Sequence, residues 1–457
     1  MRWNVRGVAL VVAIFLAGGV DVVAQEPAPQ RLTLHDAITL ALKNNLSVRV
    51  AGTQMGEAEG ARERQLATLL PHVTGDAMAK VQNSNLAILG VSLPGMPTVV
   101  GPFSYFDFRI AASQALVNRQ SYHNWKASQS QERATKLDYQ DARDLVIRQT
   151  AGLYLDAEGA LAEVQAADSR VTTSEALEKL ARDQHANQLA TGVDVVRAQV
   201  QLARDRQSLL MARDTYQTSL LVLARFLGLR LGAPLELAEQ LEFKHVDTPD
   251  LDQAVHAALD ARPDYRSLLS QRESLVEQEK ASRARYFPTF SVGGDYGALG
   301  RNFGSLPGIG EIQGTLAITL FDRDRNGEHK QLENRLQRLN DQMDDLARGI
   351  EQEIRKAVLD LESTEQQVAV TQAGLDLAQQ ELRLAEDRFR NGVTNNIEVV
   401  TAQDAVAAAQ DDRITALARH ADARAALTRA LGATEQHYQM YLGGSINQPP
   451  EQPLGGR

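Results

Sequence analysis

The sequence contains no cysteine among its 457 residues. Disulfide bonds, thiolate metal sites, cysteine nucleophiles and an acylated N-terminal cysteine are therefore excluded. Long apolar runs are also missing after the first 24 residues, because no later stretch approaches the roughly 18 apolar residues of a membrane-spanning helix. The chain beyond that point is either soluble or inserted into a membrane by strands, the alternative that satisfies the backbone in lipid.

Basic character is lacking as well, since the formal net charge is -10. A protein that binds nucleic acid needs a basic surface, so we expect no nucleic-acid partner. The nine histidines are scattered without metal-ligand spacing, and the chain has no nucleophile elbow, phosphate loop or zinc helix. We therefore expect no enzyme activity, no cofactor and no metal site.

The first 24 residues have the pattern of a secretory signal. Arg2 and Arg6 precede an apolar run over residues 8–20, and the small residue Ala24 stands at the expected cleavage site. A membrane anchor is the alternative, but the apolar run is too short to cross a bilayer. The sequence predicts a cleaved signal over residues 1–24.

The remainder is a tandem repeat, with a first half over residues 25–230, a linker over 231–248 and a second half over 249–432. The sequence motif Val195-Val196-x-Ala198-Gln199 recurs as Val399-Val400-x-Ala402-Gln403, at an offset of 204. An offset of 217 relates the beginnings of the two halves, so the first half carries extra residues between Pro71 and Leu116. One change of register over so long a stretch indicates duplication.

Most of each half is predicted to be helical. Residues 120–188 contain no proline, are dominated by good helix formers and repeat apolar positions at helical spacing. We expect first-half helices at 32–69, 118–188 and 194–228, and second-half helices at 324–390 and 398–431. At about 1.5 Å per residue, each long helix would measure roughly 100 Å, far more than a globular core.

Four segments alternate between apolar and polar residues and are predicted as strands: 71–83, 103–116, 288–297 and 312–321. Pro71 and Pro288 open the first strand of each half. The chain has 11 Phe, 10 Tyr and 2 Trp, and ten of these aromatic residues lie within 103–108 and 286–321. Such clustering is expected for aromatic girdles at membrane interfaces. The alternation favours membrane strands around a wet lumen, with a half-buried soluble sheet as the alternative. The lumen would then receive Asp76, Lys80, Asp107 and Arg109.

Four strands cannot close a barrel alone, because an open edge in lipid leaves backbone groups unpaired. Two chains would supply eight strands and three would supply twelve, and the pattern itself does not choose between them. A conducting pore favours the larger number, because side chains fill the lumen of an eight-stranded barrel.

The sequence resembles the TolC-type outer membrane efflux proteins over residues 30–433. The resemblance rests on the motif Gly-x(5)-Asp/Glu-Val-x-x-Ala-Gln, complete from Gly392 to Gln403, on the strand-opening prolines and on the Leu-Gly pair ending each half. It implies a mainly α fold: a long coiled-coil tunnel plus a shared 12-stranded antiparallel transmembrane β-barrel, with four strands from each chain of a homotrimer.

That family implies an exit duct of a tripartite efflux pump or type I secretion system. The duct would lie in the outer membrane lipid of a Gram-negative bacterium, with most of the chain in the periplasm. Its partners would be a periplasmic adaptor and an inner-membrane transporter. A passive duct has no substrate pocket, and the mixed lumen charges indicate no ion preference.

In this family the repeated motif forms the hairpins at a gated periplasmic tip. Asp194 and Glu398 begin the returning helices, where a carboxylate caps the helix and, by resemblance, lines or latches the entrance. Gln188 stands where the motif has glycine, so with Gly192 nearby we expect a differently shaped first turn. Three further positions, Phe389, Arg197 and Thr401, differ from the family pattern and predict fewer latches.

Two alternatives remain beside the duct. A periplasmic adaptor would need a lipoyl-like β module that the sequence does not supply, and a secreted coiled-coil scaffold would lack the four alternating segments. Residues 433–457, rich in proline and glycine, are expected to form a disordered tail.

Overall fold

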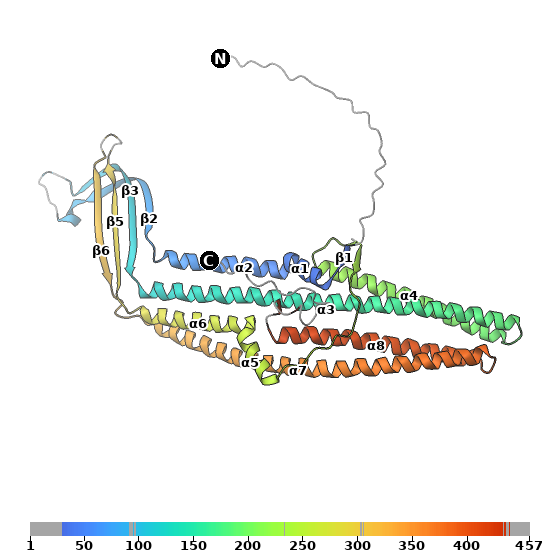
Figure 1. The fold of residues 1–457 in the computed structure, drawn as a ribbon. Coiled ribbons are helices and arrows are strands. Elements are labelled where there is room, and N and C mark those ends of the chain that lie inside the picture. Colours follow the sequence, from blue (N-terminus) through green and yellow to red (C-terminus); the bar gives the residue numbers. More distant parts are fainter. Residues whose placement is uncertain are drawn as a thin grey trace, which may run out of the picture.

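The computed structural model describes residues 30–432, except 91–94, 96, 233, 302–303 and 305, together with Thr434, Glu435 and Tyr438. The predicted signal over residues 1–24 lies outside this part. Two very long helices dominate the fold (Figure 1): α3 Arg119–Ala186 has 68 residues and α7 Asp324–Arg390 has 67. At 1.5 Å per residue each is about 100 Å long.

Each long helix turns back into a shorter antiparallel one at the same end of the molecule (Figure 1). The returning helices are α4 Gly192–Phe226 and α8 Asn396–Ala430. They begin two residues earlier than the sequence pattern placed them. We call α3 with α4 the first hairpin, and α7 with α8 the second hairpin.

The helical segment predicted over residues 32–69 consists of two helices. The chain forms a short strand, β1 Gln30–Leu32, and then two helices, α1 Leu34–Asn44 and α2 Leu46–Ala67. Asn45 interrupts them in an extended conformation, because its side chain accepts a hydrogen bond from Ser47 N–H and donates one to the Phe226 carbonyl at 3.2 Å. An asparagine that bonds locally competes with the helix in this way.

The second half repeats this break. Helix α5 Leu251–Ala261 ends before Arg262, and α6 Pro263–Ala284 begins at a proline. Proline disfavours helical backbone in the preceding residue and suits the first helical position. Arg262 is extended, and its guanidinium pairs with Asp264 at 2.7 Å and Glu353 at 2.5 Å.

The helices pack in a row. Near the turns the order of contacts is α4, α3, α8, α7, and nearer the sheet it is α2, α3, α6, α7. Each row therefore has two edge helices, one from each repeat. The repeats meet in the middle through α3.

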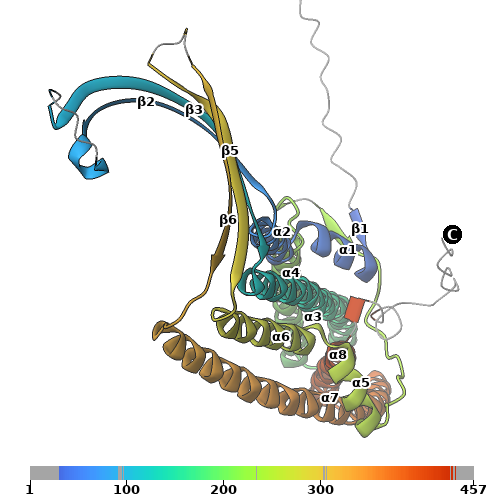
Figure 2. The same cartoon turned by 90° about the vertical axis from the view of Figure 1, so that its left-hand side faces the viewer.

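A four-stranded antiparallel sheet lies at the far end from the helical turns (Figures 1 and 2). Its order is β2 His72–Asn85, β3 Val99–Val117, β5 Thr289–Gly300 and β6 Gly308–Ala317. Strand β3 begins four residues before the expected start at 103, because Val99 and Val100 also pair with β2. Within the described chain, the outer edges of β2 and β6 have no strand partner.

The predicted linker over 231–248 is partly structured. Strand β4 Leu235–Leu237 pairs in parallel with β1, and the Tyr154 hydroxyl donates to the Leu32 carbonyl at 2.9 Å. Further along, Phe243 packs over His420, whose Nε2 lies 3.0 Å from the Lys244 carbonyl. The linker therefore joins the cores of the two halves.

The prediction of a disordered tail from residue 433 is wrong at its start. Arg143 forms an ion pair with Glu435, whose N–H donates to Asp144 at 3.2 Å, and the Tyr438 hydroxyl contacts His35 at 2.7 Å. Thr434 and Tyr438 are buried. These contacts hold Glu435 against α3 and Tyr438 against α1, and residues 439–457 lie outside the described chain.

Among the described residues, no helix combines the length and apolar character needed to cross a membrane.

Candidate functional site

The two faces of the sheet differ in chemistry. The register places Asp76 opposite Arg109 and Lys80 opposite Tyr105, so the predicted set Asp76, Lys80, Asp107 and Arg109 shares one face. Arg109 Nε lies 2.9 Å from Asp107, and its Nη1 lies 3.2 Å from Asp295. A row of charged groups therefore crosses from β2 to β5 on this face.

Two acidic residues join that row. Asp295 on β5 pairs directly with Glu311 on β6, on the same face as Arg109. Like charges directly opposite each other on a sheet repel, and Arg109 relieves this for Asp295. Asp295 lies within the predicted strand 288–297, whereas Glu311 precedes the predicted strand 312–321, and no sequence pattern gave the register that brings both beside Arg109.

The opposite face is apolar and open to the surroundings. Ile110, Tyr296, Ile312 and Leu316 are all exposed on it, Ile312 to 88%. Soluble monomers rarely present so continuous an apolar surface, which marks a face that meets lipid or another protein.

At the other end of the molecule, the two helical turns have the same backbone shape. Gln188 has φ 61° and Gly392 has φ 70°, both left-handed. Leu189 N–H bonds to the Gln184 carbonyl at 2.9 Å, and Val393 N–H bonds to the Arg388 carbonyl at the same distance. The expectation that Gln188 gives a differently shaped turn is therefore wrong, because the same helix-terminating hydrogen bonds impose the left-handed conformation on both residues.

Asp194 lies in the first turn of α4, and its carboxylate bonds to Thr191 at the start of that helix. The Thr191 hydroxyl donates to its carboxylate at 2.6 Å and the Thr191 N–H donates at 3.0 Å. Asp194 is 6% exposed. Burial opposes ionisation, but the bonds from Thr191 and from the Asn396 backbone hold the pKa of Asp194 below its usual value. Thr191, rather than Asp194, is the cap residue.

Glu398 has the matching position in α8 but a different environment. The cap residue is Asn395, whose side chain accepts from Ile397 N–H at 3.1 Å. The Glu398 carboxylate accepts hydrogen bonds from Arg388, at 2.6 Å, and from the Thr394 hydroxyl, and it remains partly exposed. Arg388 and Glu398 thus link the two helices of the second hairpin.

The other predicted tip residues are not brought into one cluster. Phe389 is buried in the core beneath the turns, which we call the tip core: Leu177, Ala181, Ala198, Ala385, Phe389, Val399 and Ala402. Arg197 lies 3.8 Å from Asp194 on the outside of α4. The Thr401 hydroxyl donates to the Ile397 carbonyl of its own helix, and Gly192 is the first residue of α4.

Two amide side chains that the sequence did not indicate tie the hairpins together. Gln184 Nε2 donates to the Phe389 carbonyl at 3.0 Å, and Asn396 Nδ2 donates to the Asp194 carbonyl at 3.0 Å. Asn396 is fully buried. The two residues occupy unrelated positions in the repeats, so the duplication carries no signal for them.

In the described part of the chain, no three His, Asp or Glu side chains gather as a metal site would require.

Comparison with known families now identifies the duplicated helix-and-strand architecture. The model of the outer membrane efflux protein family matches residues 37–229 and 254–433, which is most of the chain and covers both repeats. The chain belongs to the outer membrane efflux protein family. The resemblance to TolC-type channels drawn from the hairpin motif is thereby confirmed.

Solved structures show the fold of this efflux protein. The Campylobacter jejuni outer membrane channel CmeC has a TM-score of 0.75 at 17% identity, covering 90% of this chain and 89% of that one. The Vibrio cholerae outer membrane protein VceC has a TM-score of 0.73 at 18% identity, covering 87% and 96%. The open state of the Neisseria gonorrhoeae channel MtrE has a TM-score of 0.74 at 18% identity, covering 88% and 89%. No curated protein sequence matches the chain significantly.

Proposed function

We propose that this protein is the trimeric exit duct of an efflux pump or secretion system, a passive channel from the periplasm to the exterior of a Gram-negative bacterium. The observation that carries the proposal is that, in the described part of the chain, the sheet and both helical rows each have two edges without a partner. The sheet ends at β2 and β6, and the helical rows end at α4 and α7 near the turns and at α2 and α7 nearer the sheet. A cyclic arrangement of copies joins one edge to the other and leaves none open.

Exposed apolar residues on the edge helices support this closure. Helix α7 presents Val370, Leu377 and Leu384 at intervals of seven, and α4 presents Val193, Val196, Val200 and Leu210. A seven-residue apolar repeat is the seam of a coiled coil, so these stripes fit against each other between neighbouring copies. Three copies would supply twelve strands, enough for a wet lumen.

Engineered disulfides test the contact, and the natural absence of cysteine keeps the background clean. Val200 lies near the start of α4 and Leu384 near the end of α7. These two helix ends lie at the same end of the molecule (Figure 1). Oxidation of the double variant Val200→Cys with Leu384→Cys should give covalent dimers and trimers and nothing larger. Each single variant is the control and should give no trimer. A ladder extending beyond trimers would contradict closure at three.

The charged face of the sheet would line the barrel, and the apolar face would meet outer membrane lipid. This orientation of the sheet follows from the free energy of burial. Exposed Ile312 and Leu316 are stabilised by leaving water, whereas burying the charges of Arg109, Asp295 and Glu311 in lipid is costly. Purified protein in a planar bilayer should show discrete conductance steps. A protein that assembles as a trimer but never conducts would support a scaffold instead.

The helical turns would form the gated periplasmic entrance. Within each chain the hairpins are already tied by Gln184 and Asn396, so opening must break or carry along these bonds. Replacing Asn396 by Ala should raise the conductance of the resting channel, because the Asp194 carbonyl loses its buried partner. Thr401→Ala, on the outside of the same helix, is the matched control. Equal conductance in the two variants would place the gate elsewhere.

Family membership supports docking to a periplasmic adaptor and an inner-membrane transporter. Site-specific photo-crosslinking from exposed Leu189 and Val393 at the turns should capture the adaptor in cells. Crosslinks confined to the sheet end would contradict docking at the tip.

A further inference from the structure

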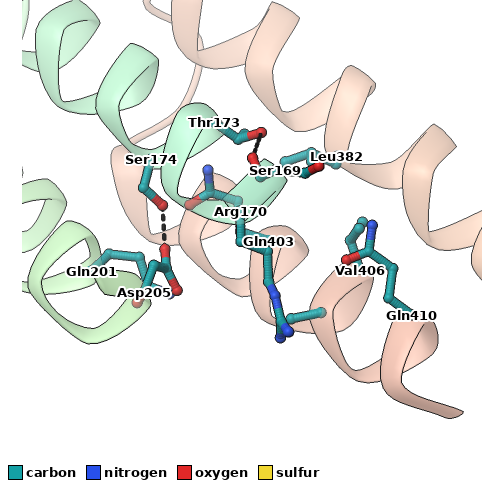
Figure 3. A pocket seen from close by; sticks show the side chains of 11 residues that line it. Ser169, Arg170, Thr173, Ser174, Gln201, Asp205, Leu382, Gln403, Val406 and Gln410 are labelled. Atoms are coloured by element: carbon teal, nitrogen blue, oxygen red, sulfur yellow. Dashed lines mark hydrogen bonds between the residues drawn. The ribbon is translucent and has the colours of Figure 1, made fainter. Parts of the chain in front are cut away.

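A polar cavity lies between the two hairpins, on the sheet side of the tip core. Its volume is about 70 Å³, and its polar lining comes from α3, α4 and α8 (Figure 3): Ser169, Arg170, Ser174, Gln201, Asp205 and Gln403. Leu382 of α7 and Val406 and Ala407 of α8 complete the wall. All four helices therefore contribute.

Several buried polar atoms around this cavity have no partner among the described residues. They are both amide atoms of Gln403, Oε1 of Gln201, Oε1 of Gln410 and Nε of Arg170. Gln201 and Gln403 are 6% and 8% exposed, so bulk water does not satisfy them. Leaving buried polar groups without hydrogen bonds is costly, and native structures rarely do so.

The protein side of the cavity offers both donors and acceptors. Gln201 Nε2 reaches Asp205 at 3.3 Å and Asp404 at 3.2 Å, and the Ser174 hydroxyl donates to Asp205. The unpaired amide atoms supply further acceptors and a donor at the same place. A buried water needs two to four polar partners and roughly 10–15 Å³, so the cavity has the size and chemistry for several waters.

The surroundings show where this polar layer falls in the molecule. On the tip side, the apolar tip core contains residues of all four helices. On the sheet side, α3 meets α8 through the partly exposed pair Arg148–Asp422 at 2.8 Å, the more buried pair Arg429–Asp141 at 2.5 Å, and Ala425, which belongs to one apolar core with α3. An exposed ion pair can exchange partners with water at little cost, whereas the apolar contacts on both sides of the cavity must rearrange when the helices move.

We propose that the cavity is a resident water site, and that its hydrogen-bonded waters let the second hairpin shift against the first when the entrance opens. Waters exchange partners as the helices move, so Gln201 of the first hairpin and Gln403 of the second stay solvated in both arrangements. The presence of the waters is inferred from the geometry of a single chain. Their effect on channel opening rests on the proposed function.

The first test is a high-resolution structure of the purified full-length protein. Ordered waters should bridge Gln403 to Gln201 and Gln410. A collapsed cavity in which the Gln403 amide bonds directly to protein would overturn the proposal, as would density for a bound organic solute.

The second test fills the cavity. Ala407→Leu adds an apolar branch into the water site, and Ala408→Leu, at an exposed neighbouring position, is the matched control. In planar bilayers the Ala407→Leu channel should open at least fivefold less often than wild type, with Ala408→Leu unchanged. Unchanged opening of Ala407→Leu, with the waters shown to be displaced, would overturn the sliding role.

A volume-conserving variant covers the case in which Ala407→Leu does not fold. Gln403→Leu removes two of the unpaired atoms and should also reduce opening, because fewer waters are held. Opening of Gln403→Leu at the wild-type frequency would overturn the proposal. If wild-type protein never conducts while the waters are present, the channel function fails and the water site stands.

Discussion

Replacing Gln188 by Gly should make the first helical turn more stable. Gln188 holds a left-handed backbone, φ 61°, which costs a residue with a Cβ about 1–2 kcal/mol. Glycine avoids this cost but loses more freedom when ordered, by roughly 0.5–1 kcal/mol. The net gain is about 1 kcal/mol, or roughly a fivefold decrease in local opening.

Hydrogen exchange followed by mass spectrometry measures this opening directly. The amides of Gln188 and Leu189 bond to the His185 and Gln184 carbonyls and report on the turn. In Gln188→Gly they should exchange roughly fivefold more slowly. The reciprocal variant Gly392→Ala, at φ 70° with nothing within 4 Å of the added Cβ, should accelerate exchange in the second turn. Unchanged or faster exchange in Gln188→Gly would refute the assignment of strain.

Three further predictions concern other parts of the molecule. Burial, with help from Glu239, raises the pKa of Glu158 from 4.5 to about 7. Its protonated form is therefore favoured by folding, and wild type should lose stability as pH rises from 4.5 to 7. In thermal unfolding, Glu158→Gln should be more stable than wild type by about 3 kcal/mol at pH 8 and equally stable at pH 4. A stability difference that persists at pH 4 would exclude the titration of Glu158 as its cause. Ile312→Arg should block membrane assembly, because an arginine at the lipid midplane costs about 2–4 kcal/mol; Gln313→Arg, on the opposite face of the same strand, should assemble, and equal assembly of both would contradict the orientation of the sheet. Glu311→Gln should lower the cation-to-anion permeability ratio in reversal-potential measurements, because it removes a carboxylate from the charged face, and an unchanged ratio would exclude Glu311 from the ion path.

Periodicity in the sequence predicted the elements whose burial pattern repeats. Helices α3 and α7 have apolar positions at regular spacing over more than sixty residues, so their type and approximate ends followed from the residues. The break at Arg262 was also predictable, because Pro263 follows it. The break at Asn45 combines a local cap, in which Ser47 N–H donates to the Asn45 side chain, with a hydrogen bond to the Phe226 carbonyl, 181 residues away, and no local pattern records the second bond.

The candidate sites were predictable only in part. Alternation placed Asp107 and Arg109 on one strand face, but the register that adds Asp295 and Glu311 depends on pairing between the repeats. Residue preference alone predicts an altered turn at Gln188, whereas backbone hydrogen bonds at the helix end enforce the left-handed conformation. The contacts of Gln184 and Asn396 depend on how two hairpins are rotated against each other.

The mass of the protein extracted from membranes tests the account most directly. Native mass spectrometry in detergent should show one species at three times the mature chain, as a barrel of four strands from each copy requires. A monomer released from cells without detergent would contradict the shared barrel and therefore the proposed function as a duct.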